Sequence, residues 1–136
     1  MFHFLRLFAD PINGLREQIS DRWSDIDVVP IECPFSAVAV RFGLSHYDPE
    51  DEAIPEPVSS GVNKFSEQNP SARFLLLQTI CWGGDCFNSG HVVKNGEITC
   101  HEEGEGALRR LVSHMGADLG PLETFEPLRR GFPWTA

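Results

Sequence analysis

The sequence predicts an α+β domain with helices packed on one face of a mostly antiparallel, five-stranded sheet, in the order β-α-β-α-β-β-β-α. Apolar residues alternate with small or polar ones over residues 35–43, which is the period of a half-buried strand. The Asn95-Gly96 pair separates two further strand-like runs and is typical of a tight hairpin. Apolar residues spaced by three and four over residues 11–23 indicate a helix.

The N-terminal part is expected to form a strand followed by a helix. Residues 2–8, FHFLRLF, carry apolar side chains on both faces, so we expect this strand near the centre of the sheet. Asp10 is a suitable N-cap, and Pro11 suits the first position of a helix over residues 11–23. The expected apolar stripe of this helix consists of Ile12, Leu15, Ile19 and Trp23.

An acidic loop lies between the next strand and the next helix. The strand is predicted over residues 35–43, after a connection that has room for a short edge strand near Val28. Residues 44–57 contain five acidic residues, three prolines and no lysine or arginine, so this loop should be solvated. A helix is expected over residues 58–69, although Gly61 weakens that pattern.

The second half of the chain is expected to form a three-stranded meander and a helix. FLLLQTICW, residues 74–82, is apolar enough for a central strand. A glycine-rich turn leads to strands over residues 87–94 and 97–102. A helix near residues 105–115 completes the regular structure.

The C-terminal tail, residues 117–136, is predicted to be irregular, with at most one short helical turn. It is too apolar for a disordered segment, so we expect its large side chains to lie back on the body of the domain. A strip that binds a partner is the alternative. The side chains concerned are Phe125, Leu128, Phe132 and Trp134.

Length and charge restrict the possible partners. The 136 residues suit a single domain over residues 1–136. The formal net charge of −9, from 11 basic and 20 acidic residues, disfavours nucleic acid and anionic membranes as partners. A basic protein surface would be attracted to this chain, although the charge serves solubility as well. We expect no cofactor, and the sequence does not predict the oligomeric state.

The cysteines and the N-terminus suggest a compartment. Four cysteines in 136 residues are too few for a disulfide scaffold. The apolar N-terminus lacks the basic start, long apolar run and cleavage site of a secretion signal. The sequence therefore predicts a cytoplasmic location with reduced thiols.

A cluster of Cys81, Cys86, His91 and Cys100 is the strongest chemical signal in the sequence. A two-residue turn at Asn95-Gly96 would put His91 directly opposite Cys100 on the same face. Two registers are considered for the preceding turn, namely a turn of Gly84-Asp85 and a turn of residues 83–85. Neither gathers four ligands, and the spacing lacks the short C-x2-C knuckle of zinc sites, so no metal site is predicted.

A disulfide within the cluster is also disfavoured by these registers. With the Gly84-Asp85 turn, Cys81 and Cys86 are diagonal neighbours about 7–8 Å apart at Cα, beyond the usual disulfide range. Local distortion at the glycines would be needed to close the gap under oxidation. A buried cysteine that packs as a small apolar residue is therefore the simplest interpretation.

These observations lead to two functional hypotheses. The first is a protein-binding domain, such as a bacterial inhibitor or immunity-type protein for a basic partner. Its expected contact residues are acidic or aromatic and form two groups, Tyr47, Asp48, Glu50, Asp51 and Glu52, and Glu102, Glu103 and Glu105. The second is a thiol-dependent enzyme that uses Cys81, Cys86 or Cys100 with His91. A purely structural subunit is a further possibility.

Overall fold

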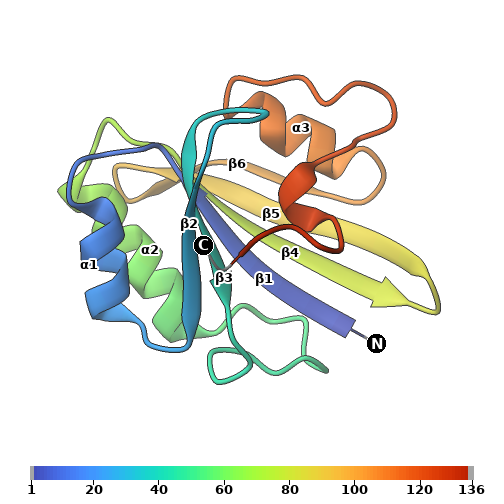
Figure 1. Cartoon of the computed structure of the whole chain (residues 1–136), viewed down its shortest axis with the longest axis horizontal. Coiled ribbons are helices and arrows are strands. Elements are labelled where there is room, and N and C mark those ends of the chain that lie inside the picture. Colours follow the sequence, from blue (N-terminus) through green and yellow to red (C-terminus); the bar gives the residue numbers. More distant parts are fainter. Residues whose placement is uncertain (1, 135–136) are drawn as a thin grey trace.

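The protein forms one six-stranded antiparallel sheet in the strand order β2-β3-β1-β4-β5-β6 (Figure 1). This fold is seen in a computed structural model, which describes residues 2–134. The elements in chain order are β1 (Phe2–Ala9), α1 (Leu15–Arg22), β2 (Ile26–Ile31), β3 (Ala37–Phe42), α2 (Glu56–Gln68), β4 (Phe74–Trp82), β5 (Asp85–Lys94), β6 (Glu97–Glu103), α3 (Ala107–Ser113) and the 3-10 helix η1 (Glu126–Leu128).

The predicted α+β class is confirmed, but the prediction of five strands is wrong. The additional strand is β2, which pairs with β3 from Ile26 opposite Phe42 to Ile31 opposite Ala37. Its sequence, IDVVPI, includes an aspartate and a proline, and so gives a weak strand signal. A proline cannot donate to a ladder, but at this edge of the sheet Pro30 is exposed and needs no second partner strand.

Helices cover both faces of the sheet, so the prediction of helices on one face is also wrong. Neighbouring residues of β1 and β4 point to opposite faces and are apolar on each of them. Leu5 and Leu76 belong to the core that α1 and α2 cover, which we call the α1/α2 face. Phe8 and Leu77 belong to the core under α3 and the tail, which we call the α3 face (Figure 1). A central strand that is apolar on both sides requires cover on both.

Helix α1 begins four residues later than the sequence predicts, after Gly14. Asp10 does not cap this helix. Its carboxylate instead accepts hydrogen bonds from Arg73, which directly precedes the neighbouring strand β4. Gly14 has φ of 85°, a left-handed conformation that glycine adopts without strain and that turns the chain into the helix.

The prediction that the tail lies back on the body is confirmed. Phe125 and Trp134 are buried on the α3 face, and Leu128 and Phe132 pack against the same core. One short helical turn, η1, interrupts the otherwise irregular segment, as expected.

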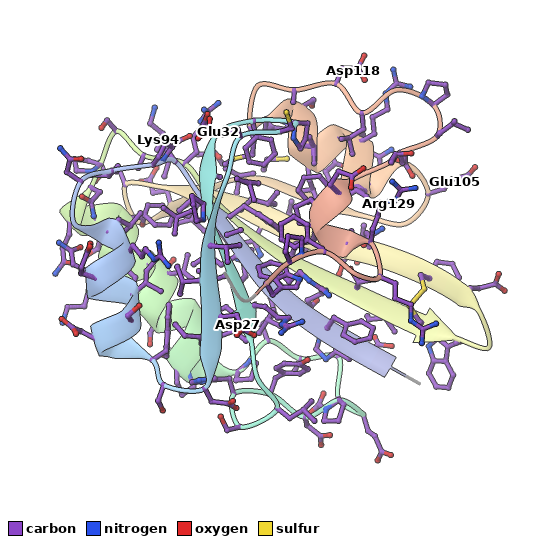
Figure 2. The ribbon with its side chains drawn as sticks, viewed as in Figure 1. Asp27, Glu32, Lys94, Glu105, Asp118 and Arg129 are labelled. Carbon is purple, nitrogen blue, oxygen red and sulfur yellow. A yellow bond between two sulfur atoms is a disulfide. The ribbon has the colours of Figure 1, made fainter. Side chains whose placement is uncertain are left out.

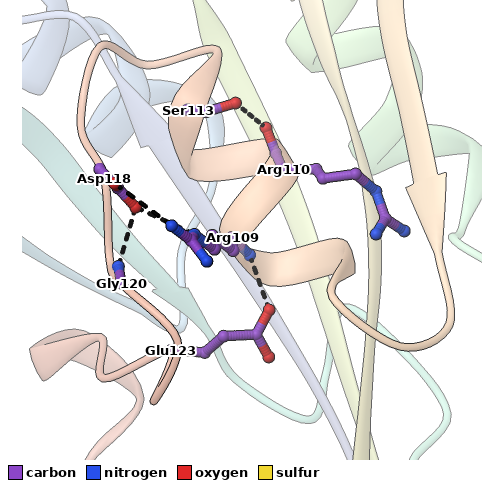
Figure 3. Close-up of polar contacts among 6 residues, drawn as sticks. All are labelled: Arg109, Arg110, Ser113, Asp118, Gly120 and Glu123. Carbon is purple, nitrogen blue, oxygen red and sulfur yellow. Dashed lines mark hydrogen bonds and ion pairs between the residues drawn. The ribbon is translucent and has the colours of Figure 1, made fainter.

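Helix α3 holds the start of the tail through Arg109 (Figure 3). The guanidinium of Arg109 donates from Nε and Nη2 to the two carboxylate oxygens of Asp118, at 3.0 and 3.3 Å. The backbone N–H of Arg109 donates to Oε1 of Glu123 at 3.2 Å. Asp118 also accepts from the backbone N–H of Gly120, which closes a turn between the two contacts. We call these contacts the clamp, which ties residues 118–123 to α3.

Within residues 2–134, none of the helices combines the length and the apolar character that crossing a bilayer requires.

Candidate functional site

Cys81 and Cys86 form a disulfide, which corrects the predicted separation of these residues. The turn between β4 and β5 is Gly83-Gly84, and both glycines have positive φ, 54° and 96°. This two-residue turn differs from both registers considered above, and it pairs Cys81 directly with Cys86. Their Cα atoms are 4.0 Å apart, and the S–S distance is 2.04 Å. Two left-handed glycines suit the tight turn that brings these cysteines opposite each other.

The predicted contact between His91 and Cys100 is also wrong. Thr99 is an additional residue in β6, so the register shifts there, and His91 pairs with His101 while Cys100 pairs with Val92. His91 and Cys100 therefore lie on opposite faces of the sheet. Burial, together with the charge of Glu102, raises the pKa of the Cys100 thiol, which disfavours a reactive thiolate.

In the described part of the chain, no three His, Cys, Asp or Glu side chains gather in a way that would hold a metal ion. His91 and His101 lie side by side on the α1/α2 face, and their rings stack with the centroids 6.3 Å apart. Burial and the neighbouring His101 both lower the pKa of His91.

The prediction of Tyr47 as a surface contact residue is wrong. Only 8% of Tyr47 is exposed. Its ring packs edge-on against that of His3, with the centroids 5.1 Å apart. Burial raises the pKa of Tyr47, although the positive charge of Arg6 opposes this shift. Tyr47 thus belongs to the core, and only the acidic residues after it remain as candidate contact residues in this part of the chain.

Within the acidic region predicted over residues 44–57, the segment 48–52 is exposed at Asp48, Glu50, Asp51 and Glu52, and from here on the name acidic loop refers to this segment. Within residues 2–134 none of its carboxylates forms an ion pair. The loop is nevertheless held in place, because Nε2 of Gln78 donates to the backbone carbonyl of Glu52 at 2.6 Å. Gln78 lies on the α1/α2 face of β4, so the loop lies beside that face.

The second predicted acidic group is divided between the two faces of β6. Glu102 pairs with Gly90 on the α3 face, where its carboxylate accepts from Nε of Arg110 at 2.6 Å. Glu103 pairs with Ser89 on the α1/α2 face and is exposed. Glu105 follows β6 and is exposed as well (Figure 2). Only Glu103 therefore shares a face with the acidic loop.

Two large aromatic side chains are exposed on the same α1/α2 face. Trp82 and Phe87 each expose 54% of their surface at the β4–β5 hairpin. Both lie on the α1/α2 face, because Trp82 is four residues beyond Gln78 on β4 and Phe87 pairs with Ile80 of β4. We call Trp82, Phe87, the acidic loop and Glu103 the acidic–aromatic face.

A cleft of about 990 Å³ lies on the α3 face between the sheet and the tail, and sequence reasoning missed it. Its sheet side is lined by Phe4, Arg6, Arg41, Thr79, Asn88 and the Cys81–Cys86 disulfide. Its tail side includes Phe125, Leu128, Arg129, Arg130, Phe132 and Trp134. Figure 2 shows Arg129 on the tail where it passes over the sheet. We call this site the arginine cleft.

Arg6 and Arg41 could have indicated the arginine cleft, because each is a single charge within an apolar strand. They pair directly with each other on β1 and β3. Arg41 donates from Nε and Nη2 to Oδ2 of Asp27, at 2.9 and 2.6 Å. Arg6 forms no ion pair among the described residues, and its Nε atom is buried without a hydrogen-bond acceptor.

Burial lowers the pKa of Arg6 to about 10; the charge interaction with Tyr47 opposes this shift, and the like charge of Arg41 adds to it. The guanidinium therefore stays charged at neutral pH.

Comparisons of the chain with protein-family models, curated proteins and solved structures give no match.

Proposed function

We propose that the protein binds a basic protein partner through the acidic–aromatic face, as an inhibitor or immunity-type protein of bacterial origin would. The hydrogen bond from Gln78 to the carbonyl of Glu52 carries this proposal. It attaches a loop whose carboxylates form no ion pair with any described residue to the sheet face that exposes Trp82 and Phe87.

The composition of this face suits protein recognition. Exposed aromatic side chains supply large apolar contact area at little entropic cost, and such residues dominate the binding energy of many interfaces. The surrounding carboxylates would speed the encounter with a basic surface and would reject acidic competitors. Glu103, two strands away from Gln78, extends the negative charge to the other side of the face.

Charge reversal in the acidic loop tests the proposal. Glu50→Lys with Asp51→Lys changes the charge of the loop, and both residues are exposed, so the fold should be retained. Glu17→Lys with Asp21→Lys makes the same charge change on the exposed side of α1, whose residues do not belong to the acidic–aromatic face. Pull-down from the source cells should recover a basic protein with wild type and with the α1 variant, but not with the loop variant.

Salt and aromatic truncation complete the test. Capture should weaken as the salt concentration rises, because exposed charges are screened. Trp82→Ala should weaken the same interaction without a change in salt dependence. The proposal fails if no salt-sensitive partner is recovered, or if the loop variant binds as well as wild type.

No second function is proposed for the cysteines. Cys81 and Cys86 are joined, and Cys100 faces away from His91. The cytoplasmic location stays a prediction, and the disulfide weighs against it because such bonds persist mainly in oxidising compartments.

A further inference from the structure

We propose that the arginine cleft is a second binding site, which takes a small organic anion with a flat apolar body and a single oxyanion head. This site is on the α3 face and does not depend on the acidic–aromatic face. Its conspicuous feature is cationic side chains gathered in a protein whose net charge is −9.

Arg6 is the expected contact for the oxyanion head. It lies beside Arg41, a like charge, yet among the described residues only Arg41 of these two has a carboxylate partner. The Arg6 guanidinium is partly desolvated, and a buried donor without an acceptor is energetically costly. An anion in the cleft would compensate this charge, and guanidinium groups bind carboxylate and phosphate oxygens with two donors.

Aromatic rings next to these arginines would hold the flat body. The Cζ atom of Arg6 lies 5.2 Å from the ring centroid of Phe4 and 5.8 Å from that of Trp134. Arg41 also approaches the ring of Trp134, at 5.5 Å. Phe4 keeps 38% of its surface exposed, which is unusual for an aromatic residue on a central strand. Stacking against a partly exposed ring beside a cation is a common way to hold an aromatic anion.

The tail adds positive charge to the lining of the cleft. Arg129 is paired with Glu126, whereas Arg130 forms no ion pair within residues 2–134. Glu123 is the one carboxylate among the lining residues, and it already accepts from the backbone N–H of Arg109. A volume of about 990 Å³ is sufficient for a ligand with one or two rings.

Calorimetric titration with matched probes tests this inference. The probes share one naphthalene body and are 2-naphthoate, 2-naphthyl phosphate and the neutral 2-naphthol, with inorganic phosphate as the head alone. We expect at least one charged naphthalene probe to bind about tenfold more tightly than 2-naphthol, because a hydrogen bond between charged groups contributes enough binding free energy for about a tenfold difference in affinity. The tighter of the two charged probes identifies the head as carboxylate or phosphate.

Variants of the cleft decide whether Arg6 makes the contact. Arg6→Gln should weaken the charged probe about tenfold and leave 2-naphthol unchanged. Arg22→Gln removes the same charge from the exposed surface of α1 and should change nothing. If Arg6→Gln does not fold, the exposed Arg130→Gln serves instead and should weaken the charged probe severalfold.

Three results would overturn the proposal. These are no binding of either charged naphthalene at millimolar concentration, equal binding of 2-naphthol, and equal losses in the α1 control and the cleft variants. In each case Arg6 would serve only to pack the tail, through its contact with Trp134.

Discussion

The carboxylate of Asp10 accepts hydrogen bonds from Arg73 at three positions. The backbone N–H and Nε of Arg73 donate to Oδ2 at 2.7 and 2.9 Å, and Nη2 donates to Oδ1 at 2.9 Å. Asp10 follows β1 and Arg73 precedes β4, so this pair joins the ends of the two central strands. Burial opposes the ionisation of Asp10, but the hydrogen bonds and charge of Arg73 outweigh it and lower the pKa of Asp10.

The first prediction is that Asp10→Asn destabilises the protein and removes part of its acid sensitivity. Because the folded state lowers the pKa of Asp10, its contribution is present above the unfolded value near 3.9 and is lost as pH falls through the folded value. Arg73 is more than a third exposed, so we expect a loss of only about 1–2 kcal/mol at neutral pH.

Urea unfolding at several pH values measures this effect. Asp21→Asn on the exposed surface of α1 is the matched control and should behave as wild type. Equal stability of the Asp10 variant and wild type at neutral pH would show that the Arg73 contacts contribute nothing.

The second prediction concerns the thiols. Without reductant, the folded protein should have two free thiols, Cys33 and Cys100, because Cys81 and Cys86 are joined. The exposed Cys33 should be alkylated quickly, and Cys100 slowly because its pKa is raised. Mass spectrometry after timed alkylation identifies the modified residues. Rapid labelling of Cys81 or Cys86 in protein purified without reductant would contradict the pairing.

The third prediction uses the fact that Tyr47 is the single tyrosine of the chain. Because burial raises its pKa, phenolate absorbance should appear at higher pH in the folded protein than in the urea-unfolded chain. The stability that this neutral phenol contributes is present below the unfolded pKa of about 10 and decreases as pH rises above that value. Tyr47→Phe should remove the alkaline part of the stability profile. Identical titrations in the two states would place Tyr47 on the surface.

The fourth prediction concerns the clamp between α3 and the tail. Arg109→Ala removes the contacts with Asp118, so the amides of residues 117–134 should exchange faster with solvent. Arg129→Ala, which removes an exposed ion pair with Glu126, is the control and should have little effect. Hydrogen exchange followed by mass spectrometry measures both. Unchanged exchange of the tail in Arg109→Ala would mean that apolar packing of Phe125 and Trp134 alone holds it.

The sequence by itself determined the elements whose signals are local and strong. The apolar run of β4 was predicted with its observed limits, residues 74–82, and the Asn95-Gly96 hairpin lies where that pair predicts it. The apolar side chains of the tail correctly indicated that this segment packs on the body. In each case burial of apolar surface or a specific turn conformation is encoded in a few adjacent residues.

Only the tertiary structure decided the register and the sites. A change of one residue in a turn or a bulge alters which residues face each other. The turn at Gly83-Gly84 pairs Cys81 with Cys86, and the additional residue Thr99 separates His91 from Cys100. The arginine cleft requires Arg6, Arg41 and a tail more than 80 positions away in the chain to meet. Such encounters depend on how strands are ordered and which face the tail covers, and short-range patterns do not encode either.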